Sequence, residues 1–330
     1  MTDLSLTERV LGGLWGAVVG DALGAPVEFQ SREQLRQNPV QDMRGYGTYR
    51  QRASTWSDDS SLILCRAEGL ADGFDTGRLG MLFTRWLNQA HWTPWQEVFD
   101  VGGTTLMAIN RLSQGVEPEQ AGLIDENSNG NGSLMRILPG TLRYFDLPVE
   151  ELLDHAHRAS SLTHRHVRGQ MACGFYCTMV SALLQGADKI EAYLQAIRAT
   201  KPVYEGPSYS GELPAFSRIF SGDIPSLPES SVRSSGYVID TLESSIWCLY
   251  NTDTYDDAVL RAVSLGEGTD TTATVAGGLA GVRYGADAIP STWLDQLARR
   301  TDLEILFNQF VAKIQAWVHR TVTTLTSSST

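Results

Sequence analysis

Residues 270–284 read DTTATVAGGLAGVRY and contain six alanine and glycine residues, three of them glycine. A glycine in a helix interior destabilises the helix by about 1 kcal/mol relative to alanine. Three glycines in one helix therefore indicate that they serve another purpose. Small side chains allow neighbouring helices to pack closely against this segment. We therefore predict that residues 270–284 form a central helix of the fold.

The rest of the chain also shows helical periodicity. One face of a first helix carries Leu11, Leu14, Trp15 and Val18, and a second helix, starting near Asp58, carries Leu62, Ile63, Cys65 and Leu70. Further helices are expected at residues 78–89, 101–112, 150–160, 167–184, 189–198, 238–250, 255–264 and 303–321. Alternating patterns of polar and apolar residues, which are typical of strands, are scarce. Residues 43–49 are the best strand candidate among a few weak ones. The sequence therefore predicts an all-α fold.

Residues 201–235 differ from the helical segments around them. They are rich in serine and glycine and hold Pro202, Pro207, Pro214, Pro225 and Pro228. This composition predicts a long irregular loop or lid. The segments before and after it show the same helical periodicity. We therefore expect a single domain over residues 1–330, with an irregular excursion at about 201–235.

The chain is acidic, with a formal net charge of -12 and a pI of about 4.9. No long basic run appears, so general nucleic-acid binding through phosphate neutralisation is not expected. An acidic protein that handles an anionic substrate needs local positive charge. Metal ions or helix N-termini supply such charge.

The N-terminal segment predicts a helix of the mature protein rather than a signal peptide. No basic region precedes its apolar stretch, which is interrupted by Asp3, Glu8 and Asp21. No apolar stretch reaches the ~20 residues that span a bilayer. Buried thiols in a reducing compartment, rather than a zinc site, explain Cys65, Cys173, Cys177 and Cys248. We therefore expect a cytoplasmic monomer without membrane association.

Two acidic clusters stand just before predicted helices: Ser57-Asp58-Asp59-Ser60 and residues 266–271, which read GEGTDT. Helix N-capping explains either cluster taken alone. Yet the adjacent carboxylates of Asp58 and Asp59 repel each other, and a hard cation would relieve that repulsion. If the clusters meet in space, their carboxylate and hydroxyl oxygens suit magnesium, manganese or calcium rather than zinc.

Glu28 lies between Val27 and Phe29 after a turn that contains glycine and proline. An acid among apolar neighbours can have a raised pKa and act as a general acid or base. A solvated loop glutamate explains the same position. The residue types alone leave both interpretations open.

A loop rich in glycine and asparagine, residues 129–136, reads NGNGSLMR. Its glycines let the backbone approach a ligand, and a following helix start offers N–H groups to phosphate. A structural turn explains the loop equally well. Gly102-Gly103 form a similar but weaker case. His164 is either a hydrogen-bonded structural histidine or a ligand contact.

The chain resembles the ADP-ribosylglycohydrolase family, which includes the dinitrogenase-reductase-activating glycohydrolase. Five stretches carry the resemblance in family order: GDALGAPVEF (20–29), TWSDDSSL (55–62), NGNGSLMRILPG (129–140), SLTH (161–164) and GEGTDTTATVAGGLAGVRYG (266–285). Each stretch alone is weak, but the set is specific. The resemblance implies an all-helical domain and a centre of two Mg²⁺ or Mn²⁺ ions. It also implies removal of ADP-ribose from an acceptor, with an arginine-type N-glycosidic linkage favoured.

The resemblance also implies roles for individual residues, by their positions in the family motifs. The implied metal ligands are Ser57, Asp58, Asp59, Asp270 and Thr271. The implied catalytic residues are Glu28, Asp59 and Asp270. The implied contacts to ADP-ribose are Gly102, Gly103, Asn129, Gly130, Asn131, Gly132, Ser133 and His164.

Position 268 departs from the family pattern, which has Asp-x-Asp-Thr where this chain has Gly268-Thr269-Asp270-Thr271. One metal-binding carboxylate is therefore missing, unless the neighbouring Glu267 replaces it. With glycine there, one of the two ions is expected to bind weakly or to be absent. A catalytically impaired protein that binds ADP-ribose is the alternative function. A helical scaffold in which both acidic clusters are only caps is a more remote one.

Overall fold

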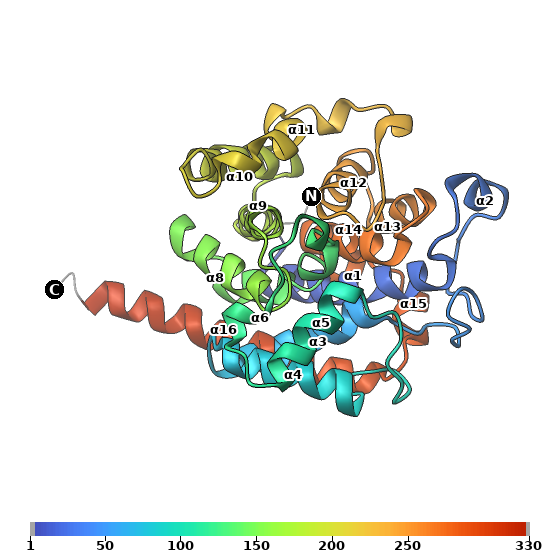
Figure 1. Ribbon diagram of the computed structural model, residues 1–330, viewed down its shortest axis with the longest axis horizontal. Helices are drawn as coiled ribbons and strands as arrows, with labels where there is room; N and C mark the ends of the chain where they lie inside the picture. Colours follow the sequence, from blue (N-terminus) through green and yellow to red (C-terminus); the bar gives the residue numbers. More distant parts are fainter. Residues whose placement is uncertain (1–3, 328–330) are drawn as a thin grey trace.

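Two antiparallel helices, α1 (Leu6–Gly24) and α14 (Thr269–Tyr284), form the centre of the molecule (Figure 1). The computed structural model describes residues 4–327. A Cβ atom added at Gly12 would lie 2.1 Å from the carbonyl oxygen of Gly281, and one at Gly16 would lie 2.4 Å from that of Gly277. Only glycine lets the two backbones approach this closely. The predicted central, closely packed helix is therefore confirmed.

The same pairing brings the end of α1 to the start of α14. Thr269 Oγ1 donates a hydrogen bond of 2.8 Å to the carbonyl oxygen of Gly24. After Gly24 the chain turns through the 3-10 helix η1 (Ala25–Val27) directly into Glu28. Glu28 and Asp270, far apart in the sequence, therefore lie side by side at this junction.

Two groups of helices pack on either side of the junction. A smaller apolar cluster joins α3 (Asp58–Gly69), α4 (Thr76–Gln89) and α5 (Gly103–Ser113) through Leu62, Leu82, Phe83, Trp86 and Ile109. The main core surrounds α14 with α9 (Val167–Leu184), α12 (Val238–Tyr250) and α13 (Tyr255–Ser264). In Figure 1 the first group lies in the lower part of the molecule and the second in the upper part.

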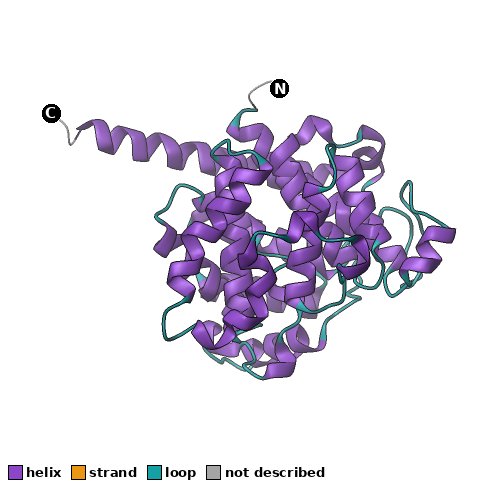
Figure 2. Cartoon of the chain, turned by 90° about the horizontal axis from the view of Figure 1, so that it is seen from above, coloured by secondary structure: helices purple, strands orange, loops and turns teal. Residues whose placement is uncertain are grey.

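The remaining elements are also helical, and residues 4–327 contain only two isolated β-bridges and no strand (Figure 2). The other α-helices are α2 (Arg32–Gln37), α6 (Pro118–Ala121), α7 (Leu138–Tyr144), α8 (Val149–Ser161), α10 (Lys189–Tyr204), α11 (Ser217–Ser221), α15 (Ser291–Gln296) and α16 (Arg300–Ser327). The other 3-10 helices are η2 (Leu70–Asp72), η3 (Glu126–Ser128), η4 (Asn131–Ser133), η5 (Ser210–Phe216), η6 (Ile224–Ser226), η7 (Glu229–Ser231) and η8 (Ala286–Ala288). The predicted all-α class is confirmed.

The irregular excursion begins later than the prolines indicated. Pro202 lies inside α10, which continues to Tyr204. A proline inside a helix removes a backbone hydrogen bond. Here the helix persists because Thr200 and Tyr204 are buried, and the Tyr204 hydroxyl lies 3.0 Å from His157 Nε2. Tertiary packing outweighs the local preference. Residues 43–49, the weak strand candidate, form an irregular loop.

The first helix is longer and more apolar than expected from the sequence. Residues 6–27 are long and apolar enough to span a membrane, although no such stretch was expected. However, 89% of the most apolar part of this segment is buried inside the protein. Its contact with α14 makes α1 a core helix. The four cysteines are free and buried, as predicted.

Candidate functional site

The start of α3 is capped by residues other than the Asp58-Asp59 pair. The Asp21 carboxylate, on α1, accepts hydrogen bonds from the backbone N–H groups of Ser57 at 3.0 Å and Ser60 at 2.9 Å. Ser57 Oγ, at the N-cap, accepts one from the backbone N–H of Asp59 at 3.2 Å. Asp21 and Ser57 accept the hydrogen bonds of these N–H groups at the start of α3. The Asp58 and Asp59 carboxylates are therefore not needed as caps and are available to bind another group.

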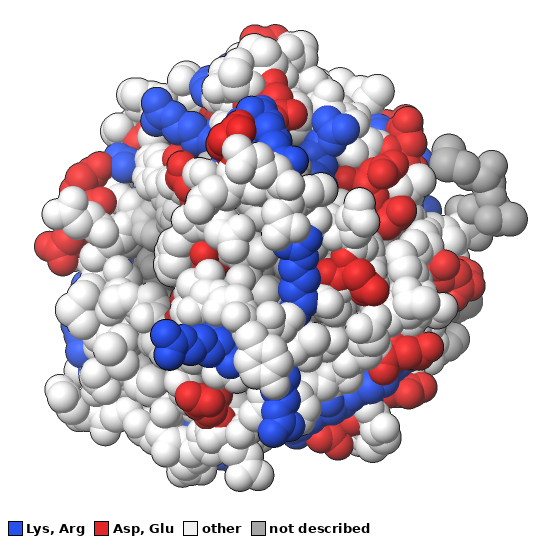
Figure 3. Space-filling model, turned by 90° about the vertical axis from the view of Figure 1, so that its right-hand side faces the viewer, with Lys and Arg blue, Asp and Glu red and all other residues white. Residues whose placement is uncertain are grey.

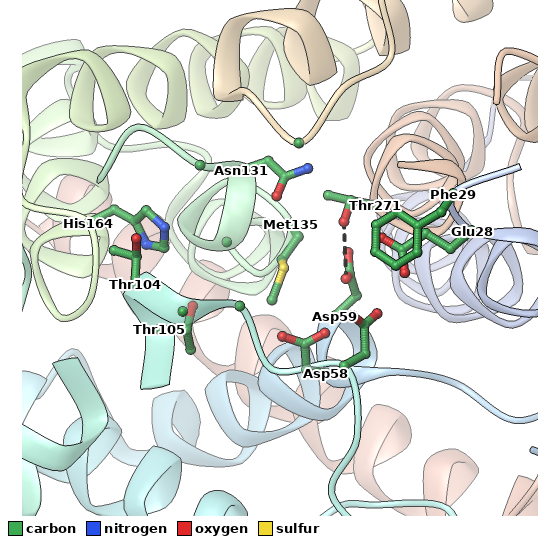
Figure 4. A pocket seen from close by; sticks show the side chains of 16 residues that line it. Glu28, Phe29, Asp58, Asp59, Thr104, Thr105, Asn131, Met135, His164 and Thr271 are labelled. Atoms are coloured by element: carbon green, nitrogen blue, oxygen red, sulfur yellow. Dashed lines mark hydrogen bonds between the residues drawn. The ribbon is translucent and has the colours of Figure 1, made fainter. Parts of the chain in front are cut away.

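The two acidic clusters meet in space. Thr271 Oγ1, in the first turn of α14, donates a hydrogen bond of 3.2 Å to Asp59 Oδ2 (Figure 4). Ser57 Oγ lies 3.4 Å from the same oxygen. Asp270 accepts a hydrogen bond from the backbone N–H of Thr271 through Oδ1. The five residues implied as metal ligands are thus all in or beside the first turns of α3 and α14.

A third acidic group adjoins the two clusters. Carboxylate oxygens of Glu28, Asp100 and Asp270 lie within 4.8 Å of one another. The Tyr49 hydroxyl lies 2.5 Å from Asp100 Oδ1 and also contacts Glu28 Oε2. A tyrosine hydroxyl has one proton to donate, so it can donate to only one of these two carboxylates. A proton held on Glu28 would satisfy the other contact.

The electrostatics of these acids favour either protons or cations. Burial raises the pKa of Asp58, Asp59 and Asp270 well above the usual range, and the neighbouring carboxylates raise each further. Burial, with the charge of Asp100 as the next cause, raises the pKa of Glu28 to about 8. Buried carboxylates in contact cannot all be ionised without a compensating charge.

Two buried oxygens in this region have no hydrogen-bond partner: Asp59 Oδ1 and Asp270 Oδ2. Orphaned buried acceptors are rare, and a missing ion or water is a usual reason for one. The donor set is made of carboxylate and hydroxyl oxygens, which suit hard divalent cations. The residues present therefore fit a magnesium-type or manganese-type centre, to which Asp59 and Asp270 would each offer an unpartnered oxygen.

A cavity of about 250 Å³ runs from this acidic region to a second, less acidic end. Its acidic end is lined by Glu28, Phe29, Asp58, Asp59, Asp100 and Thr271, and its other end includes Gly102, Gly103, Thr104, Thr105, Gly130, Asn131, Gly132, His164 and Gly236. Figure 4 shows His164 and Thr104 on one side of the pocket and Glu28 on the other. An elongated ligand can therefore reach both ends at once.

The glycine-rich loop contributes only part of its length to the cavity wall. Gly130, Asn131 and Gly132 line the cavity, whereas Asn129 and Ser133 do not. The carbonyl oxygen of Asn129 accepts a hydrogen bond from the backbone N–H of Val238. Ser133 Oγ is buried and accepts one from Ser160 Oγ. These contacts fix the ends of the loop and present its middle to a ligand.

His164 is held in one orientation by a short chain of hydrogen bonds. Arg136 Nη2 donates to Thr163 Oγ1 at 2.9 Å, and Thr163 Oγ1 lies 2.8 Å from His164 Nδ1. Among the residues that the structure describes, the Thr163 hydroxyl proton has no other acceptor, so we assign it to Nδ1. The His164 proton then sits on Nε2, close to Gly130 and Gly132 in the cavity wall. Burial, followed by the charge of Arg136, lowers the pKa of His164 to about 3, so the ring stays neutral.

The structure adds Asp21, Tyr49 and Asp100 to the residues named from the sequence. Asp100 lies between Phe99 and Val101, just before Gly102. This is the pattern of an acid among apolar residues that drew attention to Glu28, and it is the signal that was missed. Asp21, which interrupts the apolar stretch of the first helix, shows the same pattern. Tyr49 carries no such signal, because its role depends on contacts between distant segments.

Comparison with known sequences places the chain in a family. The sequence model described as ADP-ribosylglycohydrolase matches residues 2–320. The chain belongs to the ADP-ribosylglycohydrolase family. As a family member it is a hydrolase that acts on ADP-ribosylated substrates.

Relatives and a solved structure agree with this placement. The chain is 31% identical to the ADP-ribosylarginine hydrolase Tri1 of Pseudomonas putida (strain GB-1), over 90% of this chain and 76% of that protein. It is 30% identical to the ADP-ribosyl-[dinitrogen reductase] glycohydrolase of Rhodospirillum rubrum, over 92% of this chain and 95% of that protein. A solved structure titled ADP-ribosylglycohydrolase-related protein complex superposes with a TM-score of 0.79 at 32% identity, covering 94% of this chain and 99% of that one.

Gly268, where the sequence is expected to depart from the family pattern, lies at the start of α14. Gly268 is the N-cap residue of α14 and provides no side-chain cap. A Cβ atom added there would lie 3.3 Å from the carbonyl oxygen of Ser234, so a side chain needs only a small shift. Glu267 is exposed, has a left-handed backbone with φ of 60°, and is not among the residues that line the cavity. The geometry gives no support to Glu267 as a replacement ligand.

Proposed function

We propose that this family member is a metal-dependent hydrolase that removes ADP-ribose from an arginine-type N-glycosidic linkage. The observation that carries the proposal is the convergence of Asp58, Asp59, Asp270 and Thr271, with two buried carboxylate oxygens left without partners. Mg²⁺ or Mn²⁺ is the proposed cofactor, held by Ser57, Asp58, Asp59, Asp270 and Thr271. Such ions supply electrostatic polarisation of the oxygens that they contact.

The residues at the two ends of the cavity would bind different parts of the ligand. Gly102-Gly103 and residues 130–132 allow close approach of a ligand, because their side of the cavity carries little side-chain bulk. His164 offers an N–H donor at that end. We assign the diphosphate and adenosine parts of ADP-ribose to this region and the distal ribose to the acidic end.

Glu28 is the proposed general acid or base at the scissile bond. Its raised pKa keeps a proton on the carboxyl near neutral pH, and the Tyr49 hydroxyl holds the group in place beside Asp100. Hydrolysis breaks the bond between the anomeric carbon and the acceptor nitrogen and forms a bond between that carbon and the oxygen of a water molecule. Glu28 would give its proton to the departing nitrogen, and the water would return one of its protons to the Glu28 carboxylate. Asp59 and Asp270 complete the proposed catalytic group.

The acidic end of the cavity also favours an arginine acceptor. A guanidinium group forms its strongest hydrogen bonds with carboxylates. Asp100 provides a carboxylate within 4.8 Å of the Glu28 carboxyl, at the end of the cavity to which we assign the acceptor nitrogen. The names of two relatives, ADP-ribosylarginine hydrolase and ADP-ribosyl-[dinitrogen reductase] glycohydrolase, point in the same direction.

A second candidate function is ADP-ribose binding with impaired hydrolysis. Gly268 favours it, because the N-cap of α14 lacks a carboxylate at the position where the resemblance to the family implies one. The remaining donors can still hold one ion and the ribose, so binding would survive better than catalysis. Measured turnover beside measured ADP-ribose affinity separates the two functions.

We further propose a cytoplasmic monomer that binds neither membranes nor nucleic acid in general. The four free, buried cysteines suit a reducing compartment. On the face seen in Figure 3, basic and acidic side chains are interspersed, which does not favour binding to a polyanion. The oligomeric state can be measured by light scattering of the purified protein.

The proposed activity is tested with a panel of ADP-ribosylated acceptors: arginine, serine, a nucleic-acid end and a small metabolite. Free ADP-ribose is measured by mass spectrometry in the presence of Mg²⁺ or Mn²⁺. Release from the arginine substrate at the highest rate supports the proposal. Release from another acceptor only would overturn the choice of linkage, and tight binding without release would favour the second function.

A further inference from the structure

A second, more open groove lies next to the acidic end of the cavity. Its volume is about 610 Å³, and it is lined by Tyr46, Tyr49, Arg50, Gln51, Arg52, Pro94, Trp95, Gln96 and Glu97. These residues belong to two loops, one between α2 and α3 and the other between α4 and α5. We call this surface the loop groove.

Tyr49 forms the boundary between the loop groove and the catalytic cavity. Its ring lines the groove, while its hydroxyl contacts Glu28 and Asp100, which line the cavity. One side chain therefore separates the groove from the carboxylates at the proposed scissile bond. Because Tyr49 contacts both of these carboxyl groups, the group attached to the departing nitrogen would lie close to this residue.

The chemistry of the loop groove is that of a surface that binds a polypeptide. Tyr46 and Trp95 are 76% and 42% exposed, and the Arg52 guanidinium lies 4.9 Å from the centre of the Trp95 ring. Tyrosine, tryptophan and arginine are the residue types that carry most binding energy at protein interfaces. Two exposed aromatic side chains, one of them in contact with an arginine, therefore favour an interface with another polypeptide.

The charge of the loop groove is positive in an otherwise acidic protein. Arg50 and Arg52 have no ion-pair partner among the described residues, whereas the Glu97 carboxylate accepts a hydrogen bond of 3.2 Å from Gln51 Nε2. With a net charge of -12, the chain as a whole repels acidic partners. The two arginines provide a local site where an acidic segment is attracted.

The loops that form the groove are held in a defined shape. Tyr46, Arg50 and Gln96 adopt left-handed backbone conformations, with φ of 58°, 56° and 60°. Such conformations are uncommon for residues with side chains and persist only where the surroundings fix them. The Gln51–Glu97 contact joins the two loops, and Trp95 Nε1 donates to Thr55 Oγ1 at 2.8 Å. A preformed groove binds a segment at a lower entropic cost.

We propose that the loop groove binds the acceptor protein, and specifically an acidic segment of polypeptide next to the ADP-ribosylated residue. This inference rests on the proposed function, because it assigns the part of the substrate beyond the scissile bond. The ADP-ribose would fix the position of the substrate, and the groove would discriminate between acceptor proteins through charge and aromatic contacts.

The test compares three substrates that carry the same ADP-ribosylarginine. One is a peptide with aspartate and glutamate beside the modified arginine, one is the same peptide with neutral flanks, and one is ADP-ribosylarginine without a peptide. For the parent protein we expect the lowest KM with the acidic peptide. In the double variant Arg50→Ala and Arg52→Ala, the KM for the acidic peptide should rise about fivefold to tenfold, because exposed ion pairs contribute up to about a factor of five each.

The same double variant should keep its kcat, and its KM for ADP-ribosylarginine should stay within twofold. Trp95→Ala should behave in the same way, with a smaller dependence on salt. Arg198→Ala, an exposed arginine on α10, is the matched control and should change none of these values. An equal KM for all three substrates in the parent, or an equal loss for all three in the variants, would overturn the proposal.

Binding of the unmodified acidic peptide, followed by fluorescence anisotropy, separates this inference from the proposed function. If no substrate is hydrolysed but the peptide binds and the double arginine variant weakens it, the hydrolase proposal fails and the loop groove stands. If hydrolysis proceeds without any effect of the flanks, the groove proposal fails alone. A stronger dependence on Arg50 and Arg52 for an ADP-ribosylated oligonucleotide than for the peptide would also overturn it.

Discussion

Thr271 Oγ1 donates a hydrogen bond of 3.2 Å to Asp59 Oδ2, across 212 positions of sequence. This contact joins the first turn of α14 to the first turn of α3. It exists because glycines along α1 let α14 approach closely, while Asp21 on α1 holds the start of α3 through Ser57 and Ser60. A single helix therefore sets the relative position of both acidic clusters.

Removal of divalent metal should destabilise the protein, and more so at high pH. The pKa of Asp21 is raised to about 6 and that of Glu28 to about 8, both mainly by burial. Because their pKa values are raised in the folded protein, the protonated carboxyls of Asp21 and Glu28 stabilise the folded state below about pH 4.5. This stabilisation is lost as the pH rises toward 8. A bound ion offsets the ionised carboxylates, and ligand at a hundredfold excess over its Kd adds about 2.7 kcal/mol.

Melting curves at pH 5.5 and pH 8, with Mg²⁺ and with EDTA, test this prediction. We expect the shift in Tm caused by Mg²⁺ to be larger at pH 8. The protein must be shown to start metal-loaded before EDTA is added. No shift at either pH would contradict a metal site at these residues.

Glu28→Gln should lower turnover by about 10²-fold to 10⁴-fold, the usual contribution of a general acid or base. The amide keeps the size of the side chain but cannot exchange the proton. ADP-ribose affinity, measured by calorimetry, should stay within a few-fold. Glu33→Gln, on the exposed face of α2, serves as a control. Full turnover by Glu28→Gln would remove Glu28 from the catalytic group.

Thr163→Val should release His164 from its fixed protonation. The change removes the hydroxyl that we assign as donor to Nδ1, and it leaves an Arg136 N–H without an acceptor. We expect a loss of about 1–3 kcal/mol of stability and about a fivefold loss of ADP-ribose affinity. Nitrogen-15 NMR of the imidazole should report a proton on Nε2 in the parent and a mixture in the variant.

Thr163→Ser retains the hydroxyl and is the matched control for that experiment. It should restore both the parent NMR signature and the affinity. A protonated Nδ1 in the parent would contradict the assigned chain from Arg136 through Thr163 to His164.

Gly268→Asp should tighten metal binding and raise turnover, on the order of a hundredfold if the missing carboxylate is an essential electrostatic group. The Cβ of the new residue faces the carbonyl oxygen of Ser234 at 3.3 Å, so a small local shift accommodates it. Glu267→Gln should be nearly neutral, because Glu267 is exposed. Hydrolysis rates and metal stoichiometry decide the matter. A damaging Glu267→Gln together with a neutral Gly268→Asp would reverse our account.

The sequence predicted the all-α class and the central helix well, because helical periodicity and a run of small residues are local signals. Pro202 was a misleading local signal, since buried contacts of Tyr204 carry α10 past it. The apolar character of α1 was also underestimated from the sequence. A few charged residues interrupt this helix, although 89% of its apolar segment is buried inside the protein.

The candidate site was only partly predictable for a related reason. Asp58, Asp59, Asp270 and Thr271 stand in recognisable helix starts, but their meeting depends on the packing of α1 and α14. Asp100 and Tyr49 enter through loops that have no periodic pattern. Asn129 and Ser133 share a motif with Gly130 to Gly132, yet they do not line the cavity, because the Asn129 amide donates to the carbonyl oxygen of Glu126 and Ser133 Oγ accepts from Ser160.

The most direct measurement is the rate of ADP-ribose release from an ADP-ribosylarginine substrate by the parent and by Asp59→Asn, each in Mg²⁺ and in EDTA. Asp59 accepts the hydrogen bond from Thr271 and carries one of the two unpartnered oxygens, so it links the first acidic cluster to the second. Our account predicts release by the parent in Mg²⁺, loss of at least about a hundredfold in EDTA, and a similar loss in Asp59→Asn that Mg²⁺ does not restore. Equal release in EDTA, or by Asp59→Asn, would contradict a metal-dependent hydrolase built on these two clusters.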